Sequence, residues 1–353
     1  MKSLLFINPG PFGSLTDTFY YCKILKDKYD ITYLGFDESK PMVEMNGIRI
    51  IHLPGSGKKL RQKLLFVKKI REITRDYEFN FILIYYYIGC SIIRLFLKNN
   101  LVVDIRTSYI SKNLFRRILS NSIMSLEVRF FEYKSVISES LARYLWLGSK
   151  LHILPLGAPS FPLIKKDFNS LNILYVGTFH QRNIVNTILG FTRFMSRHNN
   201  QLTAKYTIIG FGTDVETQEI KDAIASSGIS DSISYDGIIR YPELIKYLEI
   251  NNVGISYIPL RKYFDNQPPT KTFEYLLSGM AVLATDTSEN RKIINDSNGI
   301  IIGESVDDIC FGLEHIYLNR VKYISEYIQN DSCKYSWDNI VNFNLVPYIE
   351  SLQ

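Results

Sequence analysis

The sequence has few cysteines and histidines, and these are scattered. Cys22, Cys90, Cys310 and Cys333 show no C-x-x-C spacing, which indicates neither a zinc site nor a disulfide framework. No Asp-x-Asp triplet occurs, and the five histidines form no ligand motif. We therefore expect no bound metal, and the cysteines suit a reducing compartment.

Long apolar runs are also missing. The longest uncharged apolar stretch, residues 79–93, is interrupted by polar residues and by glycine, and it is shorter than the roughly 18 residues that cross a bilayer. The apolar run at residues 4–7 is too short for a secretory signal, which needs about 7–15 apolar residues. We expect a cytoplasmic protein with no signal peptide and no membrane span.

The chain is long enough for two domains, and its charge is divided unevenly. Its 353 residues fit two domains of roughly 100–200 residues. Residues 1–160 carry 24 Lys and Arg against 13 Asp and Glu, whereas residues 161–353 carry 17 against 22. This difference suggests that the first half meets an anionic partner.

Strand and helix patterns alternate in both halves. In the first half, strands are expected at 3–8, 30–36, 48–53, 79–87, 101–105, 135–138 and 151–154, and helices at 16–28, 58–76 and 112–131. In the second half, strands are expected at 171–176, 205–209, 232–235, 253–257, 281–284 and 300–302, and helices at 185–198, 215–226, 242–249, 270–278 and along most of 307–352. Such alternation predicts an α/β protein with two parallel-sheet, Rossmann-like domains.

One segment gives the strongest functional signal, residues 268–285. Pro268-Pro269 precedes a predicted helix, so the amides of Thr270 and Lys271 lie in its first turn, where free N–H groups and partial positive charge suit phosphate. Glu274 follows one turn later and has a carboxylate that can accept two hydrogen bonds from a ribose diol. An ordinary helix with a well-formed start fits the same spacing.

This segment resembles the donor site of retaining glycosyltransferases with the GT-B fold, family 4 type. The family has two glutamates separated by seven residues, and Glu274 matches the second, which binds the ribose of the nucleotide. The first falls at Asn266, with Asp265 adjacent. The resemblance is specific over residues 171–302 and loose before residue 150. It implies two domains facing a central cleft.

Further matches imply the other donor-binding residues. The loop after the predicted strand at 171–176 contains Gly177, His180 and Arg182, and Thr178 replaces an arginine of the family. The resemblance implies that Arg182 and Lys271 neutralise the diphosphate. Further implied members of this site are Gly210 and Gly212 after the next strand and, in the first half, Gly10 and Gly13.

The implied catalytic residues are less well defined. Asp265 and His180 are candidates for contacting the transferred sugar, although a loop histidine often has no role. Asp104 and Arg106 lie at the carboxyl end of a predicted strand and are acceptor-side candidates, and a structural ion pair is the alternative.

Domain boundaries follow from a Gly- and Pro-containing linker near residue 160. We expect an acceptor-side domain at 1–160, a nucleotide-sugar domain at 161–335, and a C-terminal helix at 336–353 that returns to the first domain, as the resemblance implies.

Two basic amphipathic helices are predicted in the first half. The segment 58–76 is rich in Lys and Arg and places Leu60, Leu64, Val67 and Ile70 on one face. The segment 112–131 combines Lys112, Arg116, Arg117 and Arg129 with Phe115, Ile118, Met124 and Phe130. Peripheral contact with an anionic membrane, on its cytoplasmic face, is one interpretation, and solvated helix faces are the other. No nucleic-acid-binding module is visible.

We therefore predict a retaining hexosyltransferase that moves a sugar from a nucleoside-diphosphate sugar to a glycan or lipid-linked acceptor in surface polysaccharide synthesis. The donor is a substrate, and no cofactor is expected. A sugar-nucleotide epimerase, or a non-catalytic nucleotide-sugar-binding protein or partner subunit, is the alternative. A nicotinamide enzyme is disfavoured because Gly210-Phe211-Gly212 lacks the third glycine of the dinucleotide fingerprint.

Overall fold

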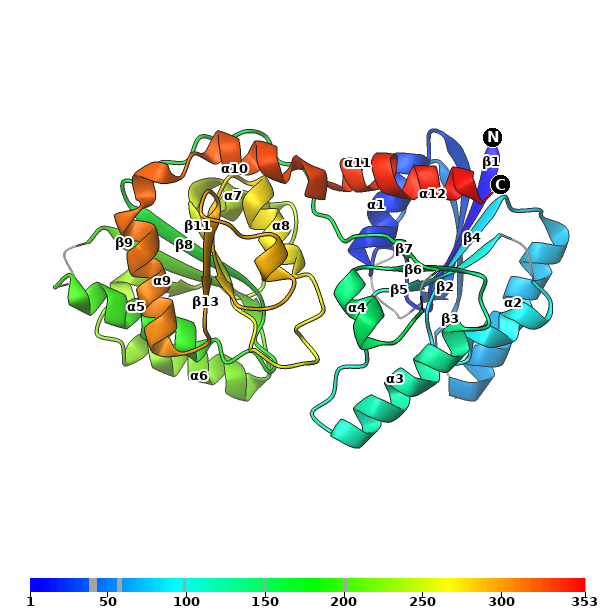
Figure 1. Cartoon of the computed structure of the whole chain (residues 1–353), viewed down its shortest axis with the longest axis horizontal. Coiled ribbons are helices and arrows are strands. Elements are labelled where there is room, and N and C mark those ends of the chain that lie inside the picture. Colours follow the sequence, from blue (N-terminus) through cyan, green and yellow to red (C-terminus); the bar gives the residue numbers. More distant parts are fainter. Residues whose placement is uncertain (38–42, 56–58, 98–99, 149, 200–201, 353) are drawn as a thin grey trace. The chain divides into compact units, whose positions relative to one another are not determined.

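The computed structural model describes residues 1–37, 43–55, 59–97, 100–148, 150–199 and 202–352. The chain forms two compact units (Figure 1). The first unit comprises Met1–Leu156 together with Trp337–Gln353, and the second comprises Gly157–Ser336.

The first unit contains a seven-stranded sheet with the order β3-β2-β1-β4-β5-β6-β7, and every strand pair in it is parallel. Its elements are β1 (Lys2–Ile7), α1 (Thr16–Leu25), β2 (Tyr29–Asp37), β3 (Ile48–Pro54), α2 (Lys59–Asp76), β4 (Phe81–Tyr85), β5 (Leu101–Ile105), α3 (Leu114–Val128), β6 (Tyr133–Val136), α4 (Glu139–Tyr144), β7 (His152–Ile153), α11 (Trp337–Ile340) and α12 (Val346–Ser351). A short 3-10 helix, Cys90–Leu95, follows β4.

The second unit contains a six-stranded parallel sheet with the order β10-β9-β8-β11-β12-β13. Its elements are β8 (Leu171–Thr178), α5 (Val185–Arg197), β9 (Ala204–Phe211), α6 (Asp214–Ala225), β10 (Ile233–Tyr235), α7 (Glu243–Ile250), β11 (Val253–Ser256), α8 (Thr270–Leu277), β12 (Ala281–Thr285), β13 (Gly299–Ile302), α9 (Val306–Leu318) and α10 (Ser325–Ser332).

The two sheets confirm the predicted α/β class with two Rossmann-like domains. In each sheet the first strand of the unit is central, because the chain adds β2 and β3 on one side of β1 and then returns to add β4 on the other. The second unit repeats this with β9 and β11 on either side of β8. Ligands of such sheets bind beyond the carboxyl ends of the strands where the order reverses, which is β1 with β4 and β8 with β11.

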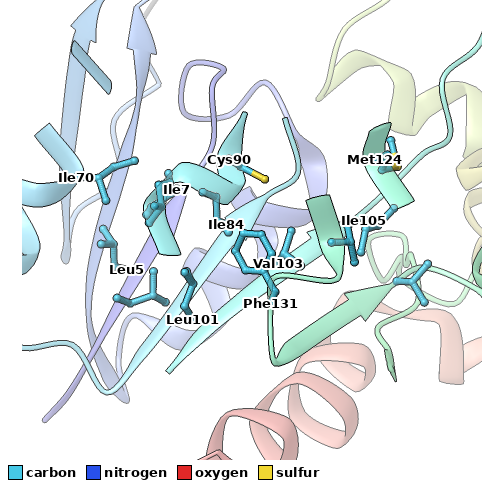
Figure 2. Close-up of a cluster of buried hydrophobic side chains, with 14 of the residues drawn as sticks. Leu5, Ile7, Ile70, Ile84, Cys90, Leu101, Val103, Ile105, Met124 and Phe131 are labelled. Carbon is cyan, nitrogen blue, oxygen red and sulfur yellow. The ribbon is translucent and has the colours of Figure 1, made fainter. Parts of the chain in front are cut away.

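Alternation along the strands builds an apolar core on each face of the first sheet. Leu5 and Ile7 of β1 point into one core, and Leu4 and Phe6 point into the other. Figure 2 shows the first core, in which Leu5 and Ile7 lie with residues such as Ile84 of β4. Strands that are buried on both faces read as continuous apolar runs, which explains why the sequence located them.

Some elements differ from the sequence prediction. Strand β4 ends at Tyr85 rather than at residue 87, because Gly89 adopts a left-handed φ of 97° and the chain turns into the 3-10 helix. Helix α4 was not predicted, although Ser138 caps it by accepting a hydrogen bond from the Leu141 amide at 3.1 Å. Six residues are too few for a clear 3.6-residue periodicity.

The apolar face predicted for α2 was correct at Ile70 and wrong at Leu64. The side chains that α2 buries against the sheet are Phe66, Ile70 and Ile73, whereas Leu64 is 64% exposed. The helix is rotated so that its aromatic residue enters the core, since Phe66 stacks on Phe36 with ring centroids 4.8 Å apart. The side chain of Leu60 and the structure of Lys58 lie outside the described residues.

The C-terminal segment belongs to the first unit, where α11 and α12 (red) lie next to α1 (blue) (Figure 1). Trp337 is 1% exposed and stacks on Tyr20 with ring centroids 5.8 Å apart. It also packs edge-on against Tyr21. Val341, Leu345 and Ile349 continue this contact into the core beneath α1.

We expect Trp337→Ala to lower the free energy of unfolding by about 3–5 kcal/mol, because it removes a fully enclosed aromatic side chain and leaves a cavity. Urea unfolding followed by circular dichroism will show the loss in the transition of the first unit. The matched control is Phe343→Ala in the same segment, since Phe343 is 78% exposed. Equal stability of the two variants would contradict the role of Trp337.

Candidate functional site

The candidate site lies at the carboxyl ends of β8 and β11, where the strand order of the second sheet reverses. A cavity of about 210 Å³ opens there between the loop after β8, the loop after β11 and the first turn of α8. Its lining residues are Arg182, Ile258, Phe264, Gln267, Pro268, Pro269, Thr270 and Lys271.

Helix α8 is held in place from below by Tyr275. The Tyr275 hydroxyl accepts a hydrogen bond from the Val176 amide of β8 at 2.9 Å. The ring crosses β11 at Gly254, where a Cβ would lie 2.3 Å from the ring carbons. Glycine at position 254 therefore lets α8 pack close to the sheet and fixes the position of its N-terminus.

The N-terminus of α8 is open. Pro269 precedes it in an extended conformation (φ −80°, ψ 117°) and has no side chain that can cap the helix. The first amides of α8 are therefore not satisfied by a side-chain cap, and they border the cavity together with the helix dipole.

Lys271 is partly buried and lies over an aromatic ring. Its Nζ is 4.0 Å from the centroid of the Tyr175 ring. Gly177 makes room for this ammonium group, because a Cβ at that glycine would lie 2.8 Å from Nζ and the backbone there has a φ of 151°. Burial, with a further effect of the nearby Arg182, lowers the pKa of Lys271 to about 7.

Arg182 is the second cation of the cavity. The residues on either side of it, Gln181 and Asn183, adopt left-handed φ values of 57° and 52°, which turns the loop sharply. Its guanidinium stacks on the Phe264 ring at 4.1 Å from the centroid. Burial lowers the pKa of Arg182, and its buried Nη1 has no hydrogen-bond partner among the described residues.

Glu274 lies one turn beyond Thr270 and is partly buried. Its Oε1 accepts a hydrogen bond from the Tyr241 hydroxyl at 3.2 Å. Burial raises the pKa of Glu274 to about 7, although the Tyr241 hydrogen bond and the charge of Lys271 oppose the rise. The carboxylate is thus held by the protein rather than lying free in solvent.

The two cations at this cavity have no ion-pair partner among the described residues that line it. Neither Lys271 nor Arg182 forms an ion pair with a carboxylate in the part of the chain that the structure describes, and no acidic residue is among those lining the cavity. Two partly desolvated cations and an open helix N-terminus on one cavity suit a ligand with more than one negative charge.

The structure brings together most of the residues predicted to bind a nucleotide. Thr270, Lys271 and Arg182 line one cavity, Gly177 packs against Lys271, and Glu274 follows on the same helix. Gly210 allows β8 and β9 to approach, because a Cβ there would lie 1.8 Å from the Gly177 carbonyl oxygen. Gly212 packs against Phe179 and Glu216.

The two predicted sugar-contacting residues of this unit have other partners. Both carboxylate oxygens of Asp265 are bound by Ser288, one by its amide at 2.7 Å and one by its hydroxyl at 2.6 Å. The His180 side chain is 60% exposed and its Nδ1 lies 3.4 Å from Glu216. Neither residue lines the cavity, and their catalytic roles stay predictions.

The other predicted site residues, Gly10, Gly13 and Asp104, belong to the first unit. Gly10 and Gly13 form the loop after β1, where Gly10 donates its amide to Asn8 at 3.0 Å and Gly13 has a φ of 83°. Asp104 is 0% exposed, binds the Ser135 hydroxyl at 2.5 Å and pairs with Arg106. Burial raises the pKa of Asp104.

The contacts of Asp104 and Arg106 fit the structural ion pair that the sequence analysis gave as the alternative to an acceptor-side role. Arg106 also lies 3.4 Å from Asp17 and donates to the Leu154 carbonyl at 3.0 Å. Asp104 and Arg106 nevertheless border a cavity of about 500 Å³ beyond β4 and β5. Their role toward an acceptor stays a prediction.

The sequence missed the aromatic residues of the site. Tyr175 reads as a core residue of β8, Tyr241 as part of a turn, and Phe264 as a loop residue, yet they contact Lys271, Glu274 and Arg182 respectively. Among the described residues, no group of three or more His, Cys, Asp or Glu side chains is arranged to hold a metal ion.

Comparison with solved structures identifies the fold. The structure is similar to sucrose-phosphate synthase from Thermosynechococcus elongatus, with a TM-score of 0.79, 13% identity and coverage of 99% of both chains. It is also similar to Anabaena Alr3699/HepE in complex with UDP, with a TM-score of 0.76, 14% identity and coverage of 99% of this chain and 100% of the other.

A third similar structure is the apo form of the lipopolysaccharide outer core galactosyltransferase WaaB, with a TM-score of 0.73, 14% identity and coverage of 99% of both chains. The chain has the GT-B fold. No protein-family model matches the sequence, and no curated protein matches it in a sequence search.

We expect Lys271→Met to stabilise the protein more at pH 6 than at pH 9. In the folded chain Lys271 loses its proton near pH 7, whereas in the unfolded chain it keeps it to about pH 10.4. The unfolded state therefore binds the extra proton between these values, and wild-type stability rises with pH there. Methionine carries no charge, so its advantage shrinks over this range, by about 1–3 kcal/mol.

Urea unfolding at the two pH values measures this difference. Lys262→Met is the matched control, because Lys262 is an exposed lysine of the same loop region. If the gain in free energy of unfolding from Lys271→Met is the same at both pH values, the pKa of Lys271 is not lowered by burial.

Proposed function

We propose that the protein is a glycosyltransferase that transfers a hexosyl group from a nucleoside-diphosphate sugar, with UDP as the nucleotide, to a glycan or lipid-linked acceptor. The observation that supports this most directly is the cavity at α8, where Lys271 and Arg182 have no carboxylate partner among the described residues. A diphosphate supplies the missing negative charge, and the ribose hydroxyls can donate to Glu274 one helical turn away.

The similar structures support the same ligand class. Anabaena HepE was solved with UDP and with UDP and glucose, and a trehalose-6-phosphate protein from E. coli was solved with UDP-2-fluoro glucose. Surface polysaccharide synthesis is the setting that we propose, in line with the lipopolysaccharide galactosyltransferase among the similar structures. We expect no cofactor beyond the donor.

The chemistry follows from the charges. Breaking the bond between the anomeric carbon and the phosphate oxygen places negative charge on the departing diphosphate. Lys271, Arg182 and the first turn of α8 border one cavity, so a diphosphate bound there would be stabilised by groups that folding has already placed. Burial lowers the pKa of Lys271, and an adjacent anion raises it again, so a bound diphosphate favours the protonated form of Lys271.

We propose retention of the anomeric configuration. The resemblance of residues 268–285 to the donor site of retaining glycosyltransferases supports this outcome. In such a mechanism the departing phosphate oxygen is the proton acceptor. The acceptor hydroxyl then attacks the anomeric carbon from the face that the phosphate leaves, and its proton passes to the phosphate oxygen. The new bond forms on the face of the old one.

A non-catalytic nucleotide-sugar-binding protein is the second candidate. The observation that favours it is the region of the family's first glutamate, where Asn266 has no carboxylate and the adjacent Asp265 is bound by Ser288. Such a protein would bind the donor by the same cations and show no turnover.

The donor-site assignment predicts that UDP raises the melting temperature and that Lys271→Met and Arg182→Gln each weaken its binding. The loss should be about tenfold or more, since a charge-assisted contact contributes about 1.5–3 kcal/mol. Calorimetric titration of UDP measures it, with GDP and ADP as competing nucleotides. Lys262→Met should bind UDP like the wild type.

Unchanged UDP affinity in both site variants would place the nucleotide elsewhere. Tight UDP binding together with neither transfer nor donor hydrolysis, with acceptor-containing membrane extracts, would support the binding protein instead.

The stereochemical proposal has its own measurement. With an α-linked UDP-hexose donor we expect an α-linked product, because attack and departure share one face. Proton NMR of the product gives the anomeric coupling constant directly. A β-linked product would require a base outside the cavity described here and would rule out retention without disproving transfer.

A further inference from the structure

Helix α3 is turned with its apolar side outward. Its inward positions, such as Met124 and Val128, are buried against the first sheet. Its outward positions should be polar in an ordinary surface helix. Instead, Phe115 is 74% exposed, Ile118 57%, Leu119 49% and Leu126 57%.

These four residues share one stripe. Positions 115, 118, 119 and 126 are separated by three, four and eleven residues from the first, a spacing that places them on one face of a helix. We call this stripe, together with Trp146, the α3 face. Large apolar side chains in one contiguous exposed group indicate an interaction surface, whereas single ones need no explanation.

Trp146 extends the stripe to the end of α4. Its side chain is 83% exposed. A groove of about 450 Å³ runs between α3 and this tryptophan, and Ile118, Leu126 and Arg129 are among its lining residues. The two elements are tied together beneath it, because the Ser125 hydroxyl donates to the Leu145 carbonyl at 2.5 Å.

The charge around the α3 face has one sign. Residues 107–131 contain Lys112, Arg116, Arg117 and Arg129, and their single acidic residue is Glu127. Glu127 points away from the face, because it accepts hydrogen bonds from the Tyr86 hydroxyl at 2.8 Å and the Gly89 amide at 2.8 Å. Helix α3 and its C-cap thus combine exposed apolar side chains with the exposed Arg116 and Arg129 and have no exposed acid, whereas Arg117 is half-buried and donates to the Ser111 carbonyl at 2.8 Å.

We propose that the α3 face docks on the surface of an anionic lipid membrane. Exposed apolar side chains enter the boundary of the acyl chains, arginines meet the lipid phosphates, and a tryptophan lies at the headgroup level. Each cation near such a surface contributes about 1 kcal/mol, so charge and apolar area act together. No helix among the described residues is long and apolar enough to span a bilayer, so the contact is peripheral.

Helix α2 has more basic residues, but among its described side chains the exposed large apolar ones are Leu64 and Leu65, fewer than on α3. Its apolar side chains Phe66, Ile70 and Ile73 are buried against the sheet, so its outward side is mainly charged. The structure therefore assigns the contact to one of the two basic helices, and α2 supplies a matched control.

A cavity of the first unit borders α3 on its inward side. Ser120 and Met124 of α3 line the cavity of about 500 Å³ beyond β4 and β5, together with Tyr86 and Tyr109. That an acceptor attached to a lipid would reach the first unit beside α3 rests on the proposed function. The docking itself does not require that function.

The full-length protein should float with vesicles of phosphatidylcholine and phosphatidylglycerol at low salt. Flotation should weaken in high salt and with pure phosphatidylcholine, because both remove the charge contribution. Tryptophan emission should shift to shorter wavelength and be quenched by brominated lipids. Trp146 reports this, since the other tryptophan, Trp337, is 1% exposed in the core.

Two variants separate the helices. Phe115→Ser with Leu119→Ser should lower the vesicle partition coefficient at least about tenfold, because both side chains are exposed and their burial in lipid is lost. Leu64→Ser with Lys68→Gln on α2 should leave it unchanged. Both pairs lie at exposed positions, so circular dichroism should show folded protein in each case.

Several results would overturn the proposal. These are no flotation with anionic vesicles, no spectral change of Trp146, or an equal loss of binding in the α2 and α3 variants. Sedimentation that shows a dimer of the wild type, dissociated by Phe115→Ser with Leu119→Ser, would assign the α3 face to contact between copies. UDP binding measured on the same variants should stay at the wild-type level, which separates this test from that of the donor site.

Discussion

The second unit depends on holding an unpaired cation against an aromatic ring. Lys271 is placed over Tyr175 by helix α8, and α8 is fixed by the hydrogen bond from the Val176 amide to Tyr275. Three glycines make this arrangement possible: Gly254 admits the Tyr275 ring, Gly177 admits the ammonium group, and Gly210 lets the neighbouring strand ends approach. Folding has already removed much of the water from the lysine ammonium group. An anion that binds there therefore does not have to meet that desolvation cost again.

The two ionisable groups of α8 reinforce this preparation. Burial moves the pKa values of Lys271 and Glu274 toward each other, so that both lie near 7. Burial thus disfavours the charged form of both groups. An anion at the helix start favours protonated Lys271, and hydroxyl donors at Glu274 favour its carboxylate. Perturbed pKa values of this kind are common at binding sites.

Much of this arrangement was predictable, and the reasons are local. Continuous apolar strands and the Pro268-Pro269 helix start are local signals, so both sheets and the position of α8 followed from the sequence. Contacts between distant segments were not: nothing near Tyr175 in the sequence indicates a lysine 96 positions later, and the Ser288 partner of Asp265 comes from another loop. The apolar face predicted for α2 failed at Leu64 for a related reason, because periodicity alone does not decide whether Leu64 or Phe66 faces the sheet.

Helix α3 shows the same limit in a more informative form. Its sequence has apolar residues on two sides, and periodicity does not say which side faces the sheet. The structure shows that Met124 and Val128 face the sheet and that the side with Phe115 and Leu119 is exposed. The inward side is fixed by polar contacts as well as by apolar ones, because Glu127 binds Tyr86, Gly89 and Ser91 from the segment after β4. Rotating α3 to bury Phe115 and Leu119 would remove that carboxylate from its three partners and expose Met124 and Val128. The hydrogen bonds of Glu127 therefore fix the orientation of α3 in which the apolar stripe faces outward. The same hydrogen bonds connect α3 to the segment after β4, at the end of the sheet where ligands of such folds bind.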